Sequence, residues 1–151
     1  MSQTGLEVFD RTIQTTNIWL DDLMHELGWS DRHQAFHALR VVLHTLRDRL
    51  PVNNSAHLAA QLPMLIRGLF FENWEPAKTT VKERSRDEFL MHITDSFVFT
   101  IDADSRQIAN AVFRVLSKHI SEGEIEKIRH ALPKTVRDLW PIDPSTGAVR
   151  S

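Results

Sequence analysis

Leu62-Pro63-Met64-Leu65-Ile66-Arg67 is a six-residue stretch that recurs 70 residues later as Leu132-Pro133-Lys134-Thr135-Val136-Arg137. The same offset aligns apolar positions along most of the chain, whereas few polar residues match. The aligned pairs include Trp19 with Phe89, Leu20 with Leu90, Val42 with Val112, Leu46 with Leu116 and Phe70 with Trp140. Self-similarity at a fixed offset indicates repeated copies of one packing unit. The sequence therefore predicts an internal duplication, but this alone indicates no activity.

Each half shows four runs of apolar residues at helical spacing, separated by capping residues and prolines. In the first half, the expected helix starts are a capping box of Thr4 with Glu7, then Ser30, Asn53 or Asn54, and Pro63. In the second half, they are the box of Ser85 with Glu88, then Asp102 or Asp104, and the box of Ser121 with Glu124. These signals predict an all-α protein.

The duplication also predicts how the chain is organised. We expect two tandem four-helix pseudo-repeats, residues 1–72 and 85–141, packed as one compact helical domain. Residues 73–84 are polar and broken by Pro76, so they read as the connector. Residues 142–151 are expected to form a flexible tail.

The composition of the 151-residue chain is ordinary for a globular protein, with 42% hydrophobic and 25% charged residues and no cysteine. Its apolar runs are a few residues long, against roughly 20 for a membrane span. The first residues lack the charged and apolar regions of an export signal. We therefore expect a cytoplasmic protein without membrane segment, disulfide framework or cofactor.

Nucleic-acid binding is not expected. A net charge of −2 gives no general attraction to phosphate backbones. The short helices around Pro63 and Pro133 have the spacing of a helix-turn-helix, but the second member of each pair carries one or two cationic side chains. That is too few for several phosphate contacts.

Three stretches carry a resemblance to a known family. They are Ala-Leu-Arg-Val-Val-Leu-His-Thr-Leu-Arg-Asp-Arg-Leu-Pro (38–51), His-Leu-Ala-Ala-Gln-Leu-Pro (57–63) and Ile-Arg-Gly-Leu-Phe-Phe-Glu-Asn-Trp (66–74). With these stretches, and a shorter second version from Ala131 to Pro141, the chain resembles the bacterial domain-of-unknown-function family 2267 from about Phe9 to Pro141. The resemblance implies a small, soluble, all-helical bacterial protein, and it brings no catalytic residues.

A basic stripe follows the second expected helix. Its members, His33, His37, Arg40, His44 and Arg47, recur at spacings of four, three, four and three. At about 100° per residue they share one narrow face, roughly opposite the apolar stripe, so we expect this face to point to solvent. The matched positions of the second half hold no histidine. Any site here therefore belongs to the first half alone.

Three interpretations of the basic stripe stay open. The plainest is a solvated helix face. In the second, Arg40, His44 and Arg47 bind an anion or an acidic partner, more strongly as histidines protonate near pH 6.5. In the third, His33 and His37 bind a metal ion, since histidines at i and i+4 can reach one zinc. A third ligand would have to come from elsewhere in the chain.

Common enzyme motifs are missing from the sequence. There is no cysteine nucleophile and no Gly-x-Ser-x-Gly elbow, and the five glycines are too far apart for a phosphate-binding loop. An active site assembled from distant positions leaves no such motif. Enzyme activity therefore stays open, but it is not what we expect.

Aromatic residues at the end of the first half offer a candidate interaction surface. Phe70 matches Trp140 and is expected in the core, while Phe71 and Trp74 either seat the connector or form an exposed patch. Such a patch would bind an unknown protein partner or a second copy of the chain. The sequence therefore favours a non-enzymatic interaction or regulatory module, with a small-molecule, anion or metal binder as the alternative.

Overall fold

The computed structural model describes residues 2–82, 84–97 and 104–141, and within these ranges every regular element is a helix. The α-helices are α1 (Glu7–Leu27), α2 (Arg32–Arg49), α3 (Val52–Gln61), α4 (Met64–Phe71), α5 (Arg86–Ser96), α6 (Ser105–His119), α7 (Glu122–Ala131) and α8 (Lys134–Arg137). A 3-10 turn, η1 (Pro76–Lys78), lies in the predicted connector. The all-helical prediction is confirmed. The tail predicted over residues 142–151 lies outside the described residues.

Membrane crossing by a helix finds no support in these ranges, because none of the described helices combines the length and the apolar character that a bilayer span requires.

Side-chain caps agree with the sequence in the second half. The hydroxyl oxygen of Ser85 accepts a hydrogen bond from the Glu88 amide at 3.1 Å, and that of Ser121 accepts one from the Glu124 amide at 3.3 Å. Of the two aspartates considered for α6, Asp104 is the cap, and its carboxylate accepts from two amides of the first turn. These contacts satisfy amide donors that a helix start leaves without partners.

Three caps predicted in the first half are wrong. Asp31, not Ser30, caps α2, because its carboxylate accepts from the two amides that follow. The hydroxyl of Thr4 donates to Asp10 and to the Leu6 carbonyl, so α1 begins without a side-chain cap. Helix α3 begins at Val52, directly after Pro51, and not at the asparagines. A neighbouring group took the place of the predicted cap each time.

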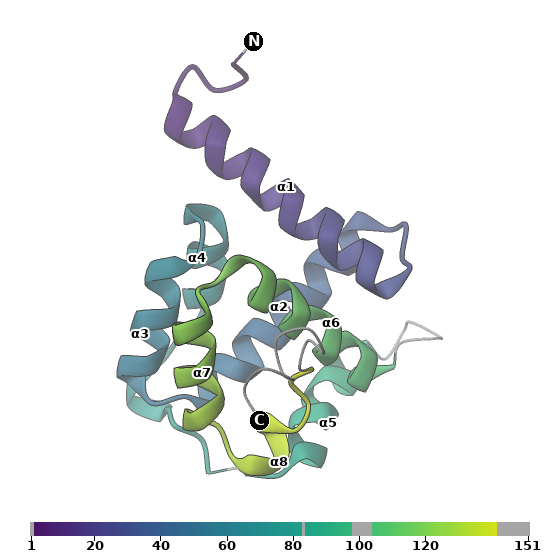
Figure 1. The fold of residues 1–151 in the computed structure, drawn as a ribbon, viewed down its shortest axis with the longest axis vertical. Coiled ribbons are helices and arrows are strands. Elements are labelled where there is room, and N and C mark those ends of the chain that lie inside the picture. The colour runs from purple at the N-terminus through teal and green to yellow at the C-terminus, as the bar shows by residue number, and fades with distance from the viewer. Residues whose placement is uncertain (1, 83, 98–103, 142–151) are drawn as a thin grey trace.

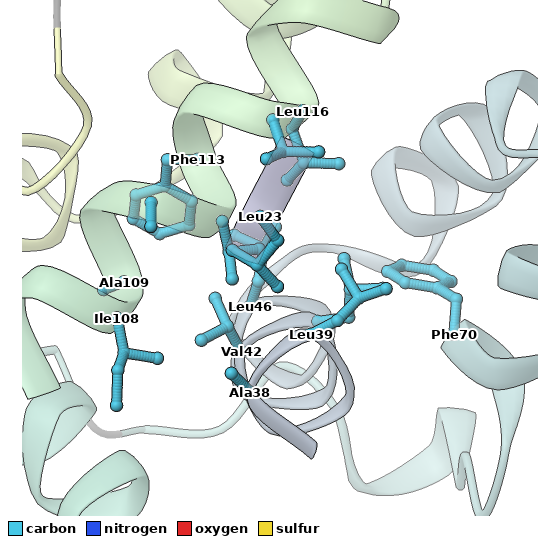
Figure 2. Packing of buried hydrophobic residues seen from close by; sticks show 14 of the residues in the cluster. Leu23, Ala38, Leu39, Val42, Leu46, Phe70, Ile108, Ala109, Phe113 and Leu116 are labelled. Carbon is cyan, nitrogen blue, oxygen red and sulfur yellow. The ribbon is translucent and has the colours of Figure 1, made fainter. Parts of the chain in front are cut away.

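Helix α2 lies at the centre of the molecule and packs against α1, α4, α5 and α6. It buries nine of its residues, among them Ala38, Leu39, Val42 and Leu46, which are at most 1% exposed. Figure 2 shows side chains from α1, α2, α4 and α6 gathered in this core, including Leu23, Val42, Phe70 and Phe113. Burial of such apolar surface is the main stabilising term in a fold of this kind.

The first half of α1 extends beyond the rest of the molecule (Figure 1), and only its second half is covered by α2 and α6. Near its middle the helix touches α4, where the Leu65 amide donates to the Thr12 hydroxyl at 3.1 Å. Side chains before that point stay exposed: Val8 is 52% and Phe9 is 43% accessible. The projecting end therefore carries apolar surface that the fold does not cover.

The recurring Leu-Pro stretch forms a turn between two short helices, and an arginine holds each turn. Arg67 donates from Nε to the Ala59 carbonyl at 2.9 Å and from Nη2 to the Leu62 carbonyl at 3.0 Å. Seventy residues later, Arg137 makes the matching bonds, at 2.8 Å to Arg129 and 3.2 Å to Leu132. Both arginines thus satisfy carbonyls at the end of the preceding helix, which otherwise lack donors.

Candidate functional site

Three residues of the basic stripe meet the C-terminal end of α4. The guanidinium of Arg47 donates from Nη1 to the carbonyls of Phe70 and Glu72, both at 2.8 Å, and its Nε lies 2.9 Å from a carboxylate oxygen of Asp48. Arg47 is 4% exposed. Cationic donors are favoured at a helix C-terminus, because its last carbonyls lack partners and carry partial negative charge. Arg47 therefore stabilises the end of α4.

His44 and Arg40 bind the same end of α4. The Nε2 atom of His44 lies 2.7 Å from the Leu69 carbonyl oxygen, and Arg40 forms a half-exposed ion pair with Glu72 at 2.8 Å. Burial holds the pKa of His44 below its usual value, and the positive charges of Arg47 and Arg40 lower it further. The Leu69 carbonyl and Glu72 act in the opposite direction but do not outweigh burial.

The expectation that the stripe faces solvent is wrong for Arg47 and for the half-buried His44. The reason is the central place of α2, which has helices on several sides and so no fully solvated face. The described contacts engage Arg40, His44 and Arg47 with α4, and anion binding by these three residues stays a prediction.

The two histidines considered as metal ligands lie apart from that contact. His33 is exposed at the start of α2, while the Nε2 atom of His37 lies 2.8 Å from the Ser96 carbonyl oxygen and its ring packs on Phe97. In the described part of the chain, no three histidine, aspartate or glutamate side chains are grouped so as to hold a metal ion. A site there would need a ligand from outside these residues or from another molecule.

Phe71 and Trp74 pack on each other with ring centroids 5.0 Å apart, and Phe71 also meets the edge of Phe70 at 5.4 Å. Both residues are half-buried. Their contacts seat the start of the connector against the end of α4. The interaction patch proposed for them stays a prediction, because the surface they leave exposed is only partial.

A pocket of about 270 Å³ lies between α2 and α5. Its polar lining comes from His44, Thr45, Asp48 and Arg49 of α2 and from His92 and Ser96 of α5. Sequence reasoning did not single out Arg49 or His92 as site residues. The stripe alone gives no signal for them, because the pocket depends on which helix packs beside α2.

The contact between α1 and α6 brings together a second set of charged residues. Asp22 receives a hydrogen bond from Nε2 of His119 at 2.7 Å and one from Nζ of Lys118 at 3.1 Å. Burial acts to raise the pKa of Asp22, but the hydrogen bonds and positive charges of His119 and Lys118 outweigh it and leave the pKa below the usual value. Arg114 and Glu26 add a longer pair at 3.9 Å.

These features define a helical protein whose buried charges mainly hold helix to helix, with one small polar pocket. The sequence profile of a family described as "Uncharacterized conserved protein (DUF2267)" matches residues 16–139. The chain belongs to this family, and the resemblance noted in its sequence is confirmed. No curated protein matches the chain. The matched region begins within α1 and leaves out the projecting first turns.

Proposed function

We propose that this protein is a non-enzymatic interaction module that associates with a second copy of itself through the first half of α1. The observation that carries the proposal is the apolar surface on this projecting end and on the adjoining start of α4. Its exposed side chains are Leu6, Val8, Phe9, Met64 and Leu65, at 39–52% accessibility or close to it, with Phe9 lowest at 43% and Val8 highest at 52%. Contiguous exposed apolar surface marks interaction sites more often than single exposed residues do.

We further propose that the fold consists of two tandem four-helix units related by the offset of 70 residues. Two observations support this: α7 spans the residues of α3 shifted by 70, and Arg67 and Arg137 make matching bonds. The packing also exchanges partners, since α1 lies on α6 while α5 lies on α2. In this arrangement, the counterpart of the first half of α1 is the connector before α5. The projecting end is therefore an addition that neither unit needs for its core.

A second copy is the occupant that the charges of this end favour. Glu7 and Arg11 form an ion pair one turn apart, on either side of Phe9. If two copies of α1 pack antiparallel about Phe9, Glu7 of each faces Arg11 of the other, and the same patch serves both molecules, as a two-fold interface requires. The patch is small, and interfaces below about 1,200 Å² are typical of weak encounters. We therefore expect reversible, concentration-dependent association.

Light scattering coupled to size-exclusion chromatography tests this proposal with charged substitutions. Phe9→Glu and Leu65→Glu place a carboxylate inside the patch and should shift the chain toward monomer at concentrations where the unmodified protein associates. Met91→Glu is the matched control, because Met91 is 57% exposed on α5, away from the patch. Equal association of all four proteins would contradict the proposal, provided that circular dichroism shows each variant folded.

Ligand binding is the second candidate function, and the pocket between α2 and α5 is the observation that favours it. The stripe residues first considered for an anion, Arg40 and Arg47, point their bonds to α4 and Asp48. Of that set, only His44 also lines the pocket. The geometry therefore favours the pocket over the exposed length of the stripe as a place for a ligand.

A further inference from the structure

Two interfaces occupy matching places in the proposed units but are closed by different chemistry. Within the offset of 70 residues, α1 matches α5 and α2 matches α6, so the α1–α6 contact corresponds to the α5–α2 contact. This correspondence uses the proposed duplication but does not depend on self-association. At the α1–α6 contact, Asp22 and Glu26 supply two carboxylates to Lys118, His119 and Arg114.

The α2–α5 contact lacks both carboxylates at the matching positions. His92 stands where the other interface has Asp22, and Ser96 stands where it has Glu26. The basic side is retained in part, since His44 matches Arg114 and Arg49 matches His119. The pocket of about 270 Å³ lies at this place, lined by these four residues among others.

The charges of the described lining favour a negatively charged ligand. Arg49 is 3% exposed; its Nη1 donates to the Thr45 carbonyl at 3.0 Å, and its guanidinium lies over the ring of Phe89. Asp48 is the acidic residue in this lining, and it is paired with the buried Arg47 at 2.9 Å. Arg47 therefore offsets its charge, while Arg49, His44 and His92 supply cationic or protonatable groups.

We propose that this pocket binds a small organic anion with two carboxylate groups, which take the places of the two carboxylates present at the other interface. The size of the pocket agrees with such a ligand, because sites for drug-sized molecules usually measure about 300–1,000 Å³ and this one is smaller. Guanidinium and imidazolium groups are suited to carboxylates, since both offer planar N–H donors.

Isothermal titration calorimetry of the full chain tests the proposal with three probes: succinate, its neutral counterpart succinamide, and inorganic phosphate. We expect succinate to bind and to weaken with added salt, and succinamide not to bind. His92→Asp and Ser96→Glu restore the acidic residues of the other interface. Each should weaken succinate binding by about tenfold or more, because a carboxylate then occupies the place of the ligand.

Stability measurements separate this result from simple unfolding. His92→Asp and Ser96→Glu should keep or raise the melting temperature, because they add a partner for the basic groups of α2. Met91→Glu, on the same helix but outside the lining, should change succinate binding by less than about twofold. Phe9→Glu should leave succinate binding intact even if it abolishes self-association.

Three outcomes would overturn the assignment. They are no heat from succinate at any concentration tested, equal binding of succinate and succinamide, and succinate binding that His92→Asp and Ser96→Glu do not weaken. Phosphate binding at least as tight as succinate binding would also overturn it, because it would show that two separated carboxylates are not what the pocket recognises.

Discussion

The imidazole of His119 stacks on the indole of Trp19, with ring centroids 4.9 Å apart and ring planes inclined by 17°. At the matching positions of the opposite interface, the guanidinium of Arg49 lies 5.2 Å from the centre of the Phe89 ring. Each contact places a cationic or protonatable group from one half on an aromatic ring of the other half. Contacts of this kind stabilise by about 0.5–2 kcal/mol beyond the burial of the ring.

Removing the arginines of the two Leu-Pro turns should cost similar amounts of stability. Arg67→Ala and Arg137→Ala each remove two bonds to the carbonyls that end the preceding helix. We expect each to lower the free energy of unfolding by about 1–2 kcal/mol, measured by urea denaturation. Arg114→Ala is the control, because its ion pair is long and half-exposed, and it should cost less than about 0.5 kcal/mol. A large difference between the two turn variants would argue against equivalent roles.

Arg47 should be far more important for stability than Arg40. Arg47→Ala leaves the Phe70 carbonyl, in a buried setting, and the Glu72 carbonyl without this donor, so we expect a loss of about 3 kcal/mol or more. Arg40→Ala removes a half-exposed ion pair and should cost at most about 1 kcal/mol. Denaturant titrations of both variants test the ranking. Equal losses would show that Arg47 is not the main support of α4.

His44 should make the protein less stable in mild acid. Its pKa is lower in the folded chain than the ordinary value of 6.5, so the unfolded chain binds the proton first. The stabilising effect is therefore complete above pH 6.5 and is lost as the pH falls through the folded pKa. The window for Asp22, whose folded pKa is also lowered, begins only below about pH 4.

Thermal melts between pH 7.5 and 5 test this pH dependence. His44→Gln keeps a donor for the Leu69 carbonyl but does not titrate, so its melting temperature should fall less in this range than that of the unmodified chain. His33→Gln, at an exposed position, should follow the unmodified chain. An unchanged pH profile in His44→Gln would assign the acid sensitivity to other groups.

The sequence was sufficient to predict the helical class and the core because apolar spacing reports directly on burial. Positions such as Leu46 and Leu116 are buried in both halves, as their shared periodicity predicts. The caps of α1 and α2 were harder to predict, because Thr4 and Ser30 each have a competing polar neighbour within a few residues. Local sequence does not rank such competitors.

The candidate site was predicted less well, for a different reason. The helical wheel of α2 places Arg47 opposite the apolar stripe, but it does not show that α4 ends beside that face. The pocket depends on the pairing of α2 with α5, so Arg49 and His92, which are 43 positions apart in sequence, meet only in three dimensions. Tertiary packing thus decided which polar residues became structural and which line a cavity.

Sedimentation velocity of the unmodified chain over a rising concentration series tests the proposed self-association most directly. The account predicts a sedimentation coefficient that increases with concentration from the monomer value toward that of a dimer, and a flat, monomeric profile for Phe9→Glu. A constant monomer value for the unmodified chain up to about 1 mM, the range of weak association, would contradict it.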